Sequence, residues 1–222
     1  MKKGLAIAGI FALSITPIAS FADHMEPDET EIRPGGYLGH RNLKGRDLRG
    51  ANLKGALLVE ASLKVANLNN ADLSGAYLYD ADLSTANLNG ANLKGSQLDG
   101  AELKGASLRS ANLNDTSLIR ADLNGADLYN ANMKSTYISS TNMRGADLNN
   151  VNLSKAKIRD SDLSGANLSG ADLNNADLNN VNLKGADFKD VNLNGVSTHQ
   201  LRGCPLRLPN EWVCENNMIT KR

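Results

Sequence analysis

A large apolar residue stands at every fifth position of this chain from Leu43 to Leu193, through 31 consecutive units without an interruption. It is Leu in all but five units, where Met, Ile or Phe takes its place. An amphipathic α-helix repeats its apolar positions about every 3.6 residues and a half-buried β-strand about every 2, so a period of five fits neither element. The chain therefore has to adopt an arrangement whose own repeat is five residues long.

The composition of the unit predicts a short extended pair followed by a turn. A small residue stands two positions before each central apolar residue, and it is Ala at 21 of the 29 such positions from Ala51 to Val191. Residues two apart in an extended segment point to the same side, so both face inward. Gly ends 14 of the 31 units, and Asn, Ser or Asp end most others, which suits a turn. A chain that turns in one sense every five residues winds into a solenoid.

The outward residues indicate four sides per coil. Lys just after the central residue recurs at spacings that are multiples of 10, with Lys189 as the exception. Residues other than Asn and Asp just before the centre cluster at spacings of 20, at Tyr37, Leu57, Tyr77, Gln97, Ser117, Tyr137 and Lys157. A three-sided coil would scatter both sets, whereas a four-sided coil of 20 residues keeps each set on fixed sides. We therefore predict a square coil, and the 31 units then make close to eight coils.

The units resemble those of a known family. Ala-Asn-Leu-Lys-Gly at 51–55, Ala-Asp-Leu-Ser-Gly at 71–75 and Ala-Asn-Leu-Ser-Gly at 166–170 look like the repeats of pentapeptide-repeat proteins. The resemblance covers residues 41–195 and implies an all-β fold, a right-handed quadrilateral β-helix. The right hand is taken from the family, because the spacing does not reveal it. We expect the β-helix to occupy residues 36–198.

The N-terminal end predicts an export signal and a leader. Lys2 and Lys3 precede an apolar run at 4–15 that is too short to span a membrane, and residues 20–22 form a small-x-small cleavage site. We expect a signal peptide at 1–22, cleavage after Ala22, Sec export to the periplasm or beyond, and no membrane span thereafter. An uncleaved membrane anchor is the alternative. Residues 23–35 are acidic and carry two prolines, which predicts a flexible leader.

The tail after the repeats predicts a cap at 199–222. Cys204 and Cys214 are the only two cysteines, and in an exported chain we expect them to form a disulfide. A solenoid needs a cap, because its last coil otherwise exposes the core and an unpaired strand edge. A ligand-binding role for the tryptophan is the alternative. The residues expected to cover this end are Leu206, Leu208, Trp212, Val213 and Met218.

Groups for catalysis, cofactor binding or metal binding are scarce. The three histidines, His24, His40 and His199, stand near the ends of the repeats, and no nucleophile elbow, phosphate loop or zinc-protease motif occurs. We therefore expect no enzyme activity, no cofactor and no metal site. The formal charge is zero and becomes −2 when residues 1–22, with their two lysines, are removed. A near-neutral chain has no electrostatic basis for binding nucleic acid.

One of the four predicted sides carries outward apolar and aromatic residues, including four of the five tyrosines. Exposed apolar patches often mark contacts, and Tyr is favoured at interfaces. The leading hypothesis is a non-enzymatic exported scaffold that binds a protein or a surface polymer through this side. Stacking between coils, or cover by the leader, is the alternative. The candidate binding face consists of Tyr37, Leu57, Val59, Tyr77, Tyr79, Ile119 and Tyr137.

Two further functions were weighed. Some members of the family resemble duplex DNA in shape and charge and protect gyrase from quinolones, but those are cytoplasmic and markedly acidic. The expected export and the near-neutral charge argue against that function here. Binding of ice or a crystal surface would need regular rows of Thr, and the four threonines of the repeats are scattered at Thr85, Thr116, Thr136 and Thr141.

Overall fold

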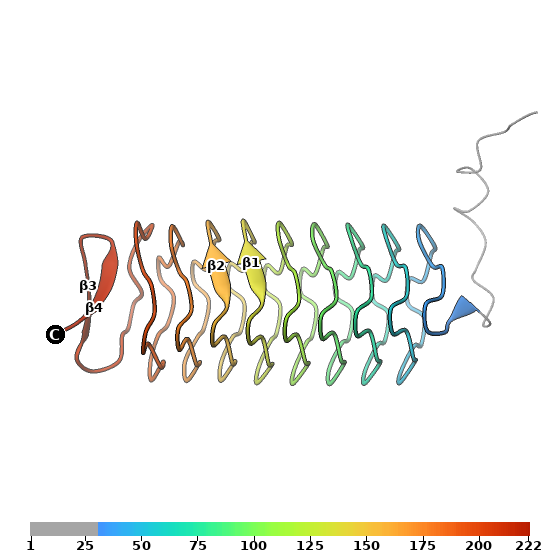
Figure 1. Ribbon diagram of the computed structural model, residues 1–222, viewed down its shortest axis with the longest axis horizontal. Helices are drawn as coiled ribbons and strands as arrows, with labels where there is room; N and C mark the ends of the chain where they lie inside the picture. The colour runs from blue at the N-terminus through green and yellow to red at the C-terminus, as the bar shows by residue number, and fades with distance from the viewer. Residues whose placement is uncertain (1–30) are drawn as a thin grey trace, which may run out of the picture.

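The computed structural model describes residues 31–222, which form a rod of stacked coils with a hairpin at its C-terminal end (Figure 1). The predicted signal peptide, and residues 23–30 of the predicted leader, lie outside the described residues. Within residues 31–222 there is no α-helix, and the extended segments are strands and bridges only a few residues long. Their brevity follows from the five-residue unit, which leaves room for about three extended residues before each turn.

The coils pair in parallel with a register of 20 residues. Tyr37 pairs with Leu57 and Leu57 with Tyr77, and the same spacing holds along the other ladders of the rod. At one place the pairing lengthens into two strands, β1 (Tyr137–Ser139) and β2 (Lys157–Arg159), with Tyr137 opposite Lys157. This is the 20-residue spacing that the outward lysines and tyrosines predict.

Unit 71–75 shows how the backbone amides are satisfied. The first amide donates across a turn to the preceding leucine carbonyl at 2.9 Å, and the second donates to the previous coil at 2.9 Å. The third and fifth amides donate to the following coil at 2.7 and 2.9 Å. The fourth amide, that of Ser74, donates to Oδ1 of Asp72 at 3.0 Å. All five donors therefore have acceptors, as buried backbone requires.

The outward Asn and Asp residues also link neighbouring coils. Asn92 Nδ2 donates to Oδ1 of Asp72 at 3.0 Å, and Asn112 Nδ2 donates to Oδ1 of Asn92 at 3.0 Å. Burial opposes ionisation of Asp72, but hydrogen bonds from Ser74 and Asn92 and the charge of Lys54 outweigh it, so the pKa of Asp72 lies below its ordinary value. The preference for Asn or Asp at this position thus follows from hydrogen bonding.

The central residues form one continuous apolar core along the rod. Leu123 near its middle is 0% exposed, and Phe188 near its end is equally buried. The few hydroxyls in the small inward position donate to carbonyls, because an unpaired buried hydroxyl is costly. Thr116 Oγ1 donates to Leu93 O at 3.0 Å, and Thr136 Oγ1 donates to Leu113 O at 3.0 Å.

The last residue of each unit adopts a left-handed backbone conformation. Gly75 has φ of 65° and Asn70 has φ of 57°, values that Gly and Asn tolerate best. Val65 and Thr85 occupy the same position with φ of 60° and 55°. A β-branched residue is a genuine outlier in this region, so the surrounding coils impose the conformation there.

The coil pairing continues beyond the last recognisable repeat. Asp187 pairs with Arg207, so residues after 198, the predicted end of the β-helix, still follow the path of the rod. Two antiparallel strands follow, β3 (Trp212–Glu215) and β4 (Met218–Lys221). Asn216 and Asn217 join them with φ of 49° and 58°, as a two-residue hairpin turn with two left-handed positions requires. The predicted disulfide joins Cys204 to Cys214 in β3 with an S–S distance of 2.02 Å.

The hairpin docks on the end of the core mainly through β4. Ile219 is 4% exposed, and its amide donates to Thr198 Oγ1 at 3.0 Å, whose hydroxyl donates back to Ile219 O at 3.1 Å. Leu208 and Trp212 pack partly buried against the core, while Val213 is half-buried and Met218 is exposed. Leu206 does not cover the core as expected.

Leu206 is 77% exposed, because its amide continues the backbone ladder to Ala186 O at 2.8 Å and its side chain points outward.

The N-terminal boundary also differs from the prediction. Residues 31–35, assigned from the sequence to the flexible leader, contact the first two coils. Gly35 N donates to Lys54 O at 2.9 Å, Ile32 packs partly buried against the core, and Glu31 pairs with Arg41 at 3.1 Å. Apolar contact and an ion pair thus extend the ordered rod to Glu31.

Substitution of Leu123 by Asp tests the inward assignment. The change places a carboxylate in the apolar core, so we expect the free energy of unfolding to fall by about 4 kcal/mol or more. Urea unfolding followed by circular dichroism measures the loss. Asn124→Asp, at the adjacent exposed position, is the matched control and should change stability little. Equal stability of the two variants would contradict the inward assignment.

The Asp residues of the outward ladders predict loss of stability in acid. At Asp162 and Asp187, as at Asp72, burial raises the pKa but hydrogen bonds and nearby cations lower it further, so the net shift is downward. A lowered folded-state pKa contributes stability above the unfolded-state value and loses it as the pH falls through the folded-state value. We expect a constant Tm from pH 8 to 5 and a fall below about pH 4. The variant D72N/D162N/D187N should show a shallower fall.

The disulfide predicts a locally stabilised cap. Removal of a bridge that closes a loop of about ten residues should cost the attachment of the hairpin roughly 2–3 kcal/mol. Because coils contact only their neighbours, the loss should be confined to the C-terminal end. In Cys204→Ser/Cys214→Ser we expect faster amide hydrogen exchange in β3 and β4 and unchanged exchange near Leu123. Unchanged exchange in the hairpin would show that the bridge does not stabilise the cap.

Candidate functional site

The rod brings together little catalytic chemistry. Among residues 31–222 no group of three or more His, Cys, Asp or Glu side chains is placed to hold a metal ion. His40 Nδ1 lies 3.2 Å from Glu60 Oε2 at the surface, and His199 Nδ1 lies 3.1 Å from Asn179 Oδ1. In the same described part of the chain, no helix is long and apolar enough to cross a membrane.

The tyrosine side is the surface formed by Tyr37, Leu57, Val59, Tyr77, Tyr79, Ile119 and Tyr137. The register places Tyr37, Leu57 and Tyr77 on three successive coils of one ladder, which continues through Gln97 and Ser117 to Tyr137. Tyr37 is 64% exposed, Tyr77 42% and Leu57 36%. The first three coils therefore present a continuous apolar and aromatic surface to solvent.

The aromatic rings at this end of the tyrosine side lie across its width. Tyr77 and Tyr79 stand on the same coil with ring centroids 6.3 Å apart and planes tilted by 33°. A Cβ placed on Gly39 would lie 3.7 Å from Cζ of Tyr37, so the ring of Tyr37 leans over a residue with no side chain. The absence of a side chain at Gly39 gives that ring its space.

The tyrosine side lacks the Asx turns of unit 71–75. Tyr37, Leu57 and Tyr77 stand where other sides carry Asn or Asp, and cannot accept the amide two residues later as Asp72 does. Within residues 31–222, no side chain accepts the amides of Val59 and Tyr79. These amides depend on solvent, so the rod gives up hydrogen bonds to expose apolar groups here.

The distal part of the tyrosine side is more polar. Tyr137 receives Lys157 Nζ over its ring at 4.7 Å from the centroid, a cation–π contact. Ile119 is 36% exposed, and its amide donates to Asp99 Oδ1 at 2.9 Å. Gln97, Asp99 and Ser117 separate these two residues from the aromatic cluster, so the seven candidates form two groups along one side.

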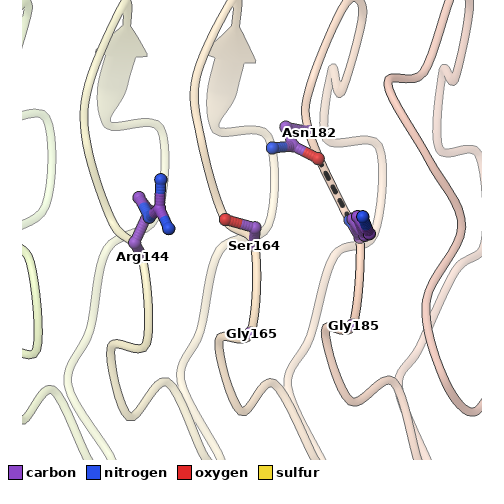
Figure 2. A pocket seen from close by; sticks show the side chains of 6 residues that line it. Arg144, Ser164, Gly165, Asn182 and Gly185 are labelled. Atoms are coloured by element: carbon purple, nitrogen blue, oxygen red, sulfur yellow. Dashed lines mark hydrogen bonds between the residues drawn. The ribbon is translucent and has the colours of Figure 1, made fainter.

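A shallow basic hollow lies on the adjacent side, near the cap. Figure 2 shows Arg144 and Ser164 on neighbouring coils, with Asn182 on the next coil. Asn182 Oδ1 accepts the Lys184 amide at 3.2 Å, and its Nδ2 donates to Asp162 at 3.0 Å. Asp162 also faces Arg144 at 3.9 Å, which offsets part of the positive charge. The lining residues are Arg144, Ser164, Gly165, Asn182, Lys184 and Gly185.

Elsewhere the outward charges neutralise one another between coils. Arg109 pairs with Asp127 and Arg159 with Asp177, each at 2.5 Å and each 18 residues apart. Lys104 and Asp122 repeat the spacing at 3.4 Å. A cation after the centre thus faces an acid before the centre of the next coil. Isolated pairs of this kind contribute little stability, but they leave no extended surface of one sign.

Two surface features escaped the sequence analysis. Val65, at a corner, is 55% exposed and extends the apolar surface beyond the tyrosine side. The basic hollow depends on Gly165 and Gly185, which have no side chains, as much as on Arg144 and Lys184. In the sequence these glycines read only as turn residues, so the 20-residue alignment of short residues with flanking cations was the available signal.

Comparison with known proteins identifies the repeats. The model of the pentapeptide repeats matches in eight copies between residues 47 and 197. The matched segments are 47–84, 66–105, 76–115, 86–125, 101–137, 126–165 and 161–197. Among curated proteins none matches the chain.

Several solved structures are similar. HetL, a pentapeptide repeat protein involved in heterocyst differentiation regulation from the cyanobacterium Nostoc sp. strain PCC 7120, is 28% identical, over 82% of this chain and 90% of its own, with a TM-score of 0.39. A pentapeptide repeat protein from the Arabidopsis thaliana thylakoid lumen is 30% identical, over 57% and 72%, with a TM-score of 0.33. QnrB1, a plasmid-mediated fluoroquinolone resistance protein, is 22% identical, over 73% and 84%, with a TM-score of 0.38.

The family assignment rests on the repeat model, whose matches cover well over half of the 222 residues. It agrees with the parallel coils, the short strands and the absence of α-helix among residues 31–222. The chain therefore belongs to the pentapeptide repeat family, whose members fold as right-handed β-helices.

Proposed function

We propose that this protein is a non-enzymatic exported scaffold that binds a protein or a surface polymer through its tyrosine side. The observation that carries the proposal is the cluster of Tyr37, Leu57, Val59, Tyr77 and Tyr79 on three successive coils. These residues replace the Asn and Asp that satisfy backbone amides elsewhere in the rod. A surface that forgoes such hydrogen bonds and exposes apolar groups is best explained by a contact that covers it.

The chemistry of the cluster suits a broad, flat partner. Tyr supplies a rigid apolar ring together with a hydroxyl, which makes it well suited to interfaces. The rings of Tyr77 and Tyr79 span the width of the side, and neighbouring coils extend the surface along the rod at about 4.8 Å per coil. A folded protein surface or an extended polymer can lie along such a row.

The proposal includes the finer architecture of the scaffold. We infer a four-sided coil, close to eight coils in all, and a C-terminal cap formed by residues 199–222. The 20-residue register supports the four sides, since four five-residue units separate paired residues. The docking of Ile219 against Thr198 supports the cap.

Export is the second part of the proposal. The signal sequence predicted at 1–22 lies outside the described residues, and it supports a periplasmic or secreted location. The Cys204–Cys214 disulfide is consistent with that location, because such bonds persist in oxidising compartments and are rare in the cytosol.

A DNA-mimicking, gyrase-binding function is not favoured. Mimicry of a duplex requires a dense array of negative charge, whereas this chain has 24 basic and 24 acidic residues. Its acids face cations on the next coil, as Asp127 faces Arg109. The similarity to QnrB1 at 22% identity reflects the shared fold.

The double variant Tyr77→Ser/Tyr79→Ser tests the binding side. Both residues point outward, so we expect the Tm to change by no more than about 2 °C, while recovery of the specific partner in pull-down falls at least about tenfold, as for loss of two interface aromatics. Recovered material, protein and polysaccharide alike, is quantified by mass spectrometry.

Tyr129→Ser is the matched control. Tyr129 is 39% exposed on a different side, where Arg109 lies 5.4 Å from its ring centroid. Its substitution should leave partner recovery unchanged. Equal recovery by the parent and by Tyr77→Ser/Tyr79→Ser would exclude the tyrosine side as the binding surface.

A further inference from the structure

The first coil breaks the rule for the small inward position. From Ala51 onward this position holds Ala, Ser, Thr or Val, yet in the first coil it holds Arg41 and Arg46. Both arginines are half-buried. A guanidinium fits at an inward position only where no earlier coil closes the bore, so these side chains belong to the open N-terminal end.

Arg41 shows what an inward arginine does at this end. Its guanidinium, with the side chain 18% exposed, binds Glu31 Oε1 at 3.1 Å. A Cβ on Gly36 would clash with the carbonyl oxygen of Glu31, so the chain preceding the first coil passes directly over the end of the rod. An acidic residue from the leader thus already covers half of this end.

The other half of the end is hollow and basic. The hollow is bounded by Ile32, Arg46, Asp47, Leu48, Arg49 and Ala51. Ala51 is only half-buried, whereas Ala71, two positions before the same side's central residue one coil later, is fully buried. The amides of Asn42 and Asn52 donate to no acceptor among residues 31–222, because no coil precedes them. This end therefore combines apolar surface, an open strand edge and positive charge.

The charge at this end complements the segment that precedes it. Residues 31–50 carry five Arg and Lys against two acids, a surplus of three positive charges. Residues 23–30 carry four acids and no Lys or Arg. Eight residues can extend about 26 Å, and one side of the coil measures about 10 Å, so the segment can cross the end from Glu31.

We propose that residues 23–30 fold back across the N-terminal end of the rod and close it. Asp28 and Glu29 lie against Arg46 and Arg49, and Met25 covers the apolar part of the hollow. Arg49 remains bound to Asp47 at 2.6 Å and adds its charge to that of Arg46. The segment also covers the open strand edge, which would otherwise pair with a second copy. This role is separate from binding at the tyrosine side.

Protection from a glutamate-specific protease tests the proposal on the full chain. A covered segment resists cleavage after Glu26 and Glu29, and the variant Arg46→Gln/Arg49→Gln should be cleaved there about ten times faster, as expected for lost charge contacts at an opening segment. Exposed Glu211 and Glu215 in the C-terminal region provide an internal control in the same digest, and their cleavage should not change. Equally fast cleavage in the parent would overturn the proposal.

Charge exchange separates docking from a general effect on folding. Arg46→Glu/Arg49→Glu and Asp28→Lys/Glu29→Lys should each remove protection, and the combined four-residue variant should restore it. Arg109→Glu/Lys189→Glu reverses two cations in the row of Arg49 and should leave protection intact. Failure of the combined variant to restore protection would overturn the proposal. A parent that is protected only as a dimer, judged by molar mass in light scattering, would instead assign the end to a second copy.

Discussion

The hydrogen bonds between coils 20 residues apart are the constraint on which the rest of this rod depends. Each five-residue unit has five backbone donors, and in unit 71–75 four of them bind backbone carbonyls while Asp72 accepts the fifth. Because the donors are satisfied by adjacent coils, no coil can form alone. The leucines then fill the bore that this pairing defines. Hydrophobic burial stabilises the rod, but the register decides which side each residue occupies.

Most of the rod was predictable because its constraints repeat. The period of five, the inward Leu and Ala positions, the 20-residue register and the Cys204–Cys214 bond all follow from patterns that recur or from a pair that has no alternative partner. One repeat carries weak information, whereas 31 in phase leave few alternatives. The same redundancy explains why the candidate face could be aligned: residues 20 apart must stack once the register is set.

The ends were harder to predict because nothing repeats there. Leu206 was expected to cover the core, but the coil continues through it to Arg207 and leaves its side chain in solvent. The two-asparagine turn and Ile219, which caps the core, followed no periodic pattern. At the other end, Arg41 and Arg46 occupy inward positions that would exclude them in any internal coil. The candidate site was found only in part, because exposure of Val65 and the basic hollow depend on neighbouring coils.

The 20-residue register also gives the sequence a phase. Insertion or deletion of four whole units would lengthen or shorten the rod and keep every later residue on its own side. Deletion of one unit would keep the leucines inward and the core intact, yet turn everything beyond it by a quarter of a revolution. Such a deletion between Tyr79 and Ile119 would separate the aromatic cluster from Ile119 and Tyr137 without unfolding the protein. Length changes in this protein are therefore also rotations, and the tyrosine side survives only those that complete a coil.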